Sequence, residues 1–263
     1  MATPELSADI LQPLSADNDL DLQRHILGVM RLMRPHRVRG YGMRRFGSPN
    51  DGGYVHIDDF QGIDTAFSFG IFDNVSWDLE VADRGLTVHQ FDHTVDAPVD
   101  NDPRLIFNRT RIATTTSGET ESIPALLARH DKGRERPNIL LKMDIENDEW
   151  PVFDALPPAA FGRFSQIVCE MHAFENFHDL GWRQRTARVL KKITDSHALV
   201  HVHANNYAGT THRANVFLPN VLEVTFANRA LYDLEPSDEV FPTALDAPCN
   251  RDVPDIYLGS FRF

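Results

Sequence analysis

The sequence lacks the features that mark secreted and membrane-inserted proteins. Its 263 residues include only two cysteines, Cys169 and Cys249, so no disulfide framework is expected and a reducing compartment is the default. The acidic N-terminus has no apolar core of the kind that signal peptides carry. No apolar run reaches the roughly 18 residues that a membrane-spanning helix needs. These absences predict a cytoplasmic protein with no membrane partner.

Basic residues are also in deficit. Lys and Arg number 26 against 38 Asp and Glu, which gives a formal net charge of −12. Proteins that bind nucleic acid generally gather Lys and Arg to replace the counterions of the phosphates. The one basic stretch of note is the group of arginines between Arg31 and Arg45. The charge balance therefore predicts no nucleic-acid partner.

Two nucleotide-binding fingerprints are missing as well. The G-x-G-x-x-G pattern is absent, which argues against a dinucleotide-binding protein. The G-x-x-x-x-G-K-[ST] pattern is absent, which argues against a P-loop nucleotidase.

The chain does contain a regular alternation of strand-like and helix-like segments. An amphipathic helix over 19–33 predicts an N-terminal helical extension over residues 1–40, followed by a single domain over 41–263 with no dividing linker. Strands alternating with helices predict βαβ units, and so an α/β fold with a central, mostly parallel sheet flanked by helices. The expected strands cover 64–69, 87–91, 105–113, 138–145, 165–172, 198–203, 221–226 and 256–261, and the expected helices cover 76–84, 122–129, 148–156 and 182–196.

Polar residues gather where these strands end. In an open parallel sheet, ligands bind at the carboxyl ends of the strands. Gly70 ends one strand, and Asp92 ends the next about 20 residues later. Glycine lets a ligand approach the backbone, and a carboxylate can accept hydrogen bonds from both hydroxyls of a ribose. The pair suits a nucleoside cofactor, although Gly70 ending a strand and Asp92 capping a turn is the plainer alternative.

A third strand end carries an acid that needs partners. Period-two alternation puts Lys142 and Asp144 on one face of an apolar strand, and a carboxylate at that place must be paired or hydrogen-bonded. The segment from Lys142 to Trp150, KMDIENDEW, resembles the K-x-D-x-E-G-x-E-W segment of FkbM-type methyltransferases. The sequence also resembles related methyltransferase-like proteins at DGGYV (51–55), SFGI (68–71) and FDH (91–93). Asn147 stands where the family usually has glycine, so a different local turn is expected there.

The resemblance implies a Rossmann-like class I methyltransferase fold, S-adenosylmethionine as the methyl donor and, usually, transfer to oxygen. Ser68 and Gly70 would line the methionine end of the cofactor. Asp92 would hold the ribose hydroxyls, with His93 beside the adenosine. Asp144 would face the junction of cofactor and acceptor.

The remaining strand ends suggest catalytic groups. Methyl transfer from a sulfonium is an in-line displacement, so the protein supplies alignment and, for a hydroxyl acceptor, a base. A neutral histidine suits that role near pH 7. We predict His172 as the base or a metal ligand, oriented by Glu170 or Asp144. If His203 also converges on this group, the four side chains would suit a divalent metal such as Mn, Fe or Zn, and the sequence leaves the presence of that metal open.

Together these patterns predict an S-adenosylmethionine-dependent methyltransferase that acts on the hydroxyl of a small molecule or sugar. A metal-dependent hydrolase using the Asp, Glu and His side chains is one alternative. A non-catalytic nucleoside-binding protein is another. The sequence leaves the acceptor, O- against N-methylation and the oligomeric state open, and a homo-oligomer is compatible with it.

Overall fold

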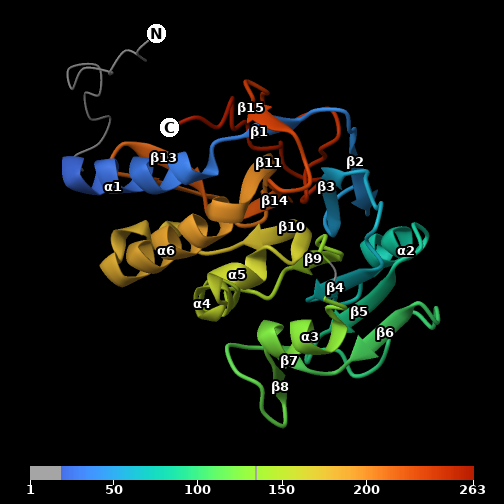
Figure 1. Ribbon diagram of the computed structural model, residues 1–263. Helices are drawn as coiled ribbons and strands as arrows, with labels where there is room; N and C mark the ends of the chain where they lie inside the picture. The colour runs from blue at the N-terminus through green and yellow to red at the C-terminus, as the bar shows by residue number, and fades with distance from the viewer. Residues whose placement is uncertain (1–18, 134) are drawn as a thin grey trace.

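The computed structural model describes residues 19–133 and 135–263 (Figure 1). The first 18 residues of the expected N-terminal extension lie outside the described residues. The expected helix over 19–33 appears as α1 (Leu20–Met30) followed by a 3-10 turn, η2 (Arg31–Met33). The side chain of Asp19 begins the helix by accepting a 2.8 Å hydrogen bond from the backbone N–H of Leu22.

A seven-stranded sheet forms the centre of the molecule, in the order β11-β14-β10-β9-β4-β5-β6. β14 runs antiparallel to both of its neighbours, and the other pairs are parallel. This arrangement confirms the expected Rossmann-like α/β fold with a central, mostly parallel sheet flanked by helices. The strands are β4 (Thr65–Phe69), β5 (Thr87–Phe91), β6 (Leu105–Asn108), β9 (Ile139–Met143), β10 (Phe164–Met171), β11 (His197–Ala204) and β14 (Leu222–Asn228).

Different elements cover the two faces of the sheet (Figure 1). Alternation along the strands sends Phe67 and Leu141 to one face and Ala66 and Leu140 to the other. The first face packs against α1 and against α3 (Ile123–His130), α4 (Glu149–Ala155), α5 (Pro158–Phe161), η3 (Phe174–His178) and α6 (Leu180–Ser196). The second packs against α2 (Ser76–Ala82) and the hairpin of β2 (Met43–Gly47) and β3 (Gly53–Ile57).

The short strands depart most from the sequence-based expectations. The extended stretch over 105–113 divides into β6 and β7 (Arg111–Ile112), which pairs with β8 (Thr120–Glu121). The expected strand over 256–261 is wrong, because its backbone meets a partner only at an isolated bridge between Phe241 and Gly259. Two further pairs were not expected: β1 (His36–Val38) with β15 (Leu234–Pro236), and β12 (Thr210–Arg213) with β13 (Val216–Pro219).

Within the described part of the chain, no helix combines the length and the apolar character that crossing a bilayer requires.

The turn at Gly70 brings the ends of two central strands into contact. Its φ of +73° lies in the left-handed region that favours glycine. A Cβ at this position would lie 1.6 Å from the carbonyl oxygen of Asp144, which follows β9. Only a residue without a side chain allows β4 and β9 to end this close together.

We predict that Gly70→Ala destabilises the fold by more than its backbone conformation alone explains. The matched control is Gly85→Ala, since Gly85 has a φ of +93° and open space around its Cβ position. The control should lose about 1–2 kcal/mol of unfolding free energy from the left-handed backbone. Gly70→Ala should lose about 1–3 kcal/mol more from the overlap with the Asp144 carbonyl. Urea unfolding measures both variants, and equal losses would contradict the close approach.

Candidate active site

A cavity of about 790 Å³ opens at the carboxyl ends of β4, β5, β9 and β10. This is the edge of an open α/β sheet where ligands bind, and the volume is in the range of small-molecule sites. Five of the predicted site residues meet here in addition to Gly70. They are Asp92, His93, Asp144, Glu170 and His172.

Asp92 holds the loop that follows Gly70. Its Oδ2 accepts hydrogen bonds of 3.0 Å from the backbone N–H groups of Ile71 and Phe72. Its Oδ1 accepts from the N–H of Thr94 at 2.8 Å and from the Thr94 hydroxyl at 2.6 Å. Burial acts to raise the pKa of Asp92, but these hydrogen bonds outweigh it and hold the pKa below its ordinary value.

The four hydrogen bonds also limit what Asp92 can bind. A carboxylate offers about four lone-pair sites, and the loop and Thr94 engage that number. The hydroxyls of a ribose could therefore bind Asp92 only by sharing Oδ1 with the Thr94 hydroxyl or by displacing that hydroxyl from it. Asp92 therefore does hold a turn, as the plainer alternative from the sequence had it, and its expected role toward a ribose stays a prediction.

Asp144 lines the cavity next to Gly70 and close to Glu170 and His172. The hydroxyl of Tyr54 donates to Asp144 Oδ2 at 3.0 Å, while the buried Oδ1 has no hydrogen-bond partner among the described residues. The ammonium of Lys142 donates to the Gly70 carbonyl at 2.6 Å and lies 5.5 Å from the centre of the Tyr54 ring. Tyr54 was missed as a site residue, although it belongs to the DGGYV segment that carried part of the resemblance.

The turn after Asp144 takes a left-handed backbone despite having no glycine. Asn147 has a φ of +81°, and Glu146 before it has a φ of +54°. Asparagine tolerates this region better than most residues. The change from glycine to Asn147 therefore does not by itself call for a different turn, because asparagine adopts here the left-handed conformation that glycine favours.

His172 carries a positive charge near neutral pH. Its Nδ1 lies 3.2 Å from Glu149 Oε1, an ion pair without hydrogen-bond geometry, and its Nε2 lies 3.5 Å from Glu146 Oε2. Burial lowers the pKa of His172, but Glu149, Asp144 and Glu146 outweigh it and raise the pKa to about 9. An imidazolium cannot accept a proton, which works against the expected role of His172 as the base. Glu149, the fully buried partner responsible, was not identified as a site residue from the sequence.

Glu170 is the second group whose environment changes its expected role. It is buried, and Asn205 donates to its Oε1 at 2.6 Å. Burial, with the nearby carboxylates of Asp144 and Glu223, raises the pKa of Glu170 well above its ordinary value. Burial and the neighbouring carboxylates thus both favour the neutral form of Glu170.

Two predicted site residues lie away from the cavity. Ser68 is fully buried within β4 and does not line it. His203 does not line it either, because β14 lies between β10 and β11. Glu223 of β14 pairs with Glu170 of β10 on one side and with His203 of β11 on the other. The expected convergence of four ligands is corrected to two groups. Asp144, Glu170 and His172 form one, and His203, Glu223 and Cys249 form the other.

Comparisons with known proteins add one likeness. No protein-family model and no curated protein matches the chain, so the resemblance to FkbM-type methyltransferases stays a prediction. A solved structure that it resembles is a single-site mutant of the 16S rRNA (adenine(1408)-N(1))-methyltransferase from Catenulisporales acidiphilia. The identity is 9% and the TM-score 0.32, over 74% of this chain and 99% of that chain.

This neighbour corrects one expectation. The sequence predicted a small-molecule acceptor and no nucleic-acid partner, whereas the neighbouring enzyme is named for ribosomal RNA. That expectation is withdrawn, and the class of acceptor is left open.

We predict that NMR titration of His172 gives a pKa of about 9, and that Glu149→Gln lowers it. Because the folded pKa exceeds the ordinary value of 6.5, protonated His172 stabilises the fold fully below pH 6.5, and this stability is lost as the pH rises through about 9. Glu146→Gln is the matched control, since the Glu146 side chain is 84% exposed and its charge is screened by solvent. A wild-type pKa at or below 6.5 would show that the ion pair with Glu149 does not form.

Proposed function

We propose that this protein is an S-adenosylmethionine-dependent methyltransferase that transfers the methyl group to an oxygen atom beside Asp144. The observation that carries the proposal is the cavity in which the Gly70 turn, Asp92 and the carboxylate of Asp144 line one space. The donor would lie toward Gly70 and Asp92, and the acceptor toward Asp144 and His172.

The charges of the cavity suit this donor. S-adenosylmethionine carries a sulfonium and an ammonium, and it supplies a methyl group already activated for displacement. The basic side chains at the cavity have partners of their own: Lys142 is bound to the Gly70 carbonyl, and Arg111 is paired with Asp148. Apart from Glu170, whose neutral form is favoured, the lining is rich in acids, namely Asp51, Asp73, Asp92, Asp144, Glu146 and Asp148.

The donor side has groups for both parts of a nucleoside. Asp92, next to the Thr94 hydroxyl, can exchange that contact for a ribose hydroxyl. Phe72 lines the cavity with its side chain 71% exposed, and an aromatic face in that state can stack on a base. His93, also exposed at the cavity, would lie beside the adenosine.

The acceptor side divides the proton chemistry between three residues. Asp144 is the group we assign as proton acceptor, since its Oδ1 has no partner within residues 19–133 and 135–263 and Tyr54 fixes its Oδ2. The positive charge of His172 favours an acceptor oxygen as it loses its proton. The raised pKa of Glu170 favours its neutral form, in which it adds no negative charge to oppose that step. The fixed positions of these groups would supply alignment for an in-line transfer.

One observation favours a second candidate function. Asp144, Glu170 and His172 each offer a ligand atom within 4.8 Å of the others, which is close enough for one metal ion. A metal there could activate a water molecule, as in a metal-dependent hydrolase. Binding of S-adenosylmethionine separates the two functions, because a hydrolase of this kind has no need of the donor.

We predict that S-adenosylmethionine and its demethylated product bind to the protein in calorimetry, and that Asp92→Ala weakens both at least about tenfold. A hydrogen bond to a charged acceptor contributes about 1.5–3 kcal/mol, and tenfold corresponds to about 1.4 kcal/mol. Asp96→Ala is the control, since Asp96 is exposed, pairs with Arg109 and lies outside the cavity. Absence of binding to the wild type would remove the methyltransferase proposal, and unchanged affinity in Asp92→Ala would remove the position assigned to the ribose.

We predict that Asp144→Asn keeps donor affinity within about threefold and lowers methyl transfer about a hundredfold or more, the range expected for a lost general base. Transfer is measured with labelled donor and a cell extract separated into small-molecule, nucleic-acid and protein fractions, which also identifies the acceptor class. Asp102→Asn, outside the cavity and paired with Arg104, should leave transfer unchanged. Binding of the donor with no transfer to any fraction would instead indicate a non-catalytic nucleoside-binding protein.

A further inference from the structure

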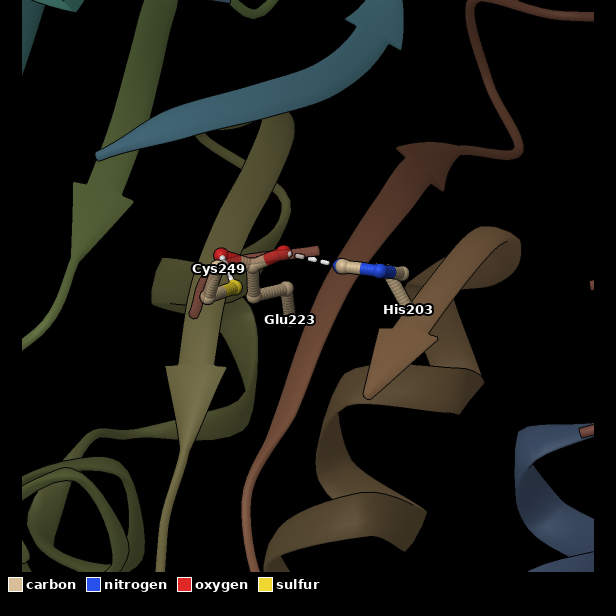
Figure 2. A group of neighbouring side chains, drawn as sticks. All are labelled: His203, Glu223 and Cys249. Atoms are coloured by element: carbon tan, nitrogen blue, oxygen red, sulfur yellow. Dashed lines mark hydrogen bonds and ion pairs between the residues drawn. The ribbon is translucent and has the colours of Figure 1, made fainter. Parts of the chain in front are cut away.

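A second cluster of ligand-type side chains lies outside the cavity, where the end of the chain packs against the sheet. His203 comes from β11, Glu223 from β14 and Cys249 from the C-terminal segment, and all three are buried (Figure 2). His203 Nδ1 lies 2.6 Å from Glu223 Oε2, and Cys249 Sγ lies 3.4 Å from Glu223 Oε1. The three side chains offer ligand atoms that lie within 4.8 Å of one another.

The mixture of donors fits zinc better than the other common divalent metals. Zinc in proteins is bound by thiolate, imidazole and carboxylate, whereas magnesium and calcium take oxygen ligands. Glu223 Oε2 lies beside His203 Nδ1, and Glu223 Oε1 lies beside Cys249 Sγ. If both Glu223 oxygens bind, the three side chains supply four ligand atoms. The burial of all three matches a structural zinc site, which is closed to solvent.

A fourth residue orients the histidine. Asp255 places its two carboxylate oxygens 3.0 and 3.1 Å from His203 Nε2, on the opposite side of the ring from Glu223. Histidines that bind metals usually donate their second N–H to a carboxylate or carbonyl, which fixes the ring and leaves the other nitrogen for the metal. Asp255 therefore leaves Nδ1 as the ligand atom of His203.

Binding a zinc ion here would leave the net charge of the cluster unchanged. With His203 protonated, the imidazolium lies between the carboxylates of Glu223 and Asp255. A zinc ion would replace two protons, one from His203 Nδ1 and one from Cys249 Sγ, and both protons would leave to solvent. The two states carry the same net charge, so the cost of burying an uncompensated ion does not arise.

The cluster also joins the C-terminal segment to the sheet. After β15, residues 237–263 form no helix or strand apart from the isolated bridge, yet the segment packs on the rest of the chain. Irregular segments of this length are uncommon in compact domains unless they have a function. Asp246 contacts His201 at 2.8 Å, and Asn206 donates to the backbone of Asn250 at 3.0 Å.

From this juxtaposition we propose that His203, Glu223 and Cys249 bind a structural zinc ion that fastens the C-terminal segment to β11 and β14. The site is separate from the cavity, because none of the three ligands lines it. It does not depend on the proposed methyltransferase activity, and its test requires neither donor nor acceptor.

The test measures the metal content of the full-length protein purified without chelators. Elemental analysis should find about one zinc ion per chain, and Cys249→Ala and His203→Gln should each reduce it at least about fivefold. Cys169→Ala is the matched control, since Cys169 is the other buried thiol and lies outside the cluster. Cobalt added to the metal-free protein should give the ultraviolet absorption of a cobalt–thiolate bond in the wild type and in Cys169→Ala, but not in Cys249→Ala.

Three results would overturn the proposal. One is a wild-type protein without zinc whose metal-free form also shows no cobalt–thiolate absorption. Another is zinc that persists in Cys249→Ala. The third combines two observations: His172→Ala loses its zinc, and the wild type shows no cobalt–thiolate absorption. Together they would assign the metal to Asp144, Glu170 and His172 instead. If Cys249→Ala fails to fold, the spectrum of cobalt in the wild type still decides whether a thiolate binds the metal.

Discussion

The contact between Gly70 and the Asp144 carbonyl is the constraint on which the rest of the site depends. No Cβ fits at Gly70, so the chain leaving β4 and the chain leaving β9 run against each other. The N–H of Asp144 donates to the Phe69 carbonyl at 3.0 Å, and Lys142 donates to the Gly70 carbonyl at 2.6 Å. Because these contacts fix both strand ends, the loop held by Asp92 and the carboxylate of Asp144 face the same cavity. The loop held by Asp92 and the Asp144 carboxylate are therefore linked by the single backbone contact at Gly70.

Burial and neighbouring charges together set the protonation of the acids and histidines of this cavity, acting in the same direction on Glu170 and in opposite directions on His172. Glu170 has lost water and gained negative neighbours, so both effects favour its neutral form. His172 has lost water too, but three carboxylates face it and the charged form prevails. A sequence pattern that places a histidine near an acid cannot distinguish these outcomes, because they depend on which partner is buried. Glu149, hidden at the start of α4, determines the state of His172.

The sequence was most informative where a local pattern determines the structure. Apolar runs with an acid, a glycine or a histidine at their ends predicted β4, β5, β9 and β10, and with them the positions of Gly70, Asp92, Asp144 and His172. The order of the strands in space was harder, because β14 pairs with strands on either side that precede it in the chain. That insertion separates His203 from Glu170, and no periodicity within β11 could reveal it. The expected strand over 256–261 was wrong for a related reason: a strand forms only where its backbone pairs with a neighbour, and this stretch does so only at the bridge between Phe241 and Gly259.

The two clusters of ligand-type residues on this side of the sheet are linked through the end of β11. Asn205 donates to Glu170 inside the cavity at 2.6 Å, while Asn206, the next residue, donates to the backbone of Asn250 in the C-terminal segment at 3.0 Å. Across the sheet, Glu170 pairs in register with Glu223, the central member of the second cluster. Two adjacent asparagines therefore hold both the C-terminal segment and buried Glu170, so the two clusters share the turn that follows β11.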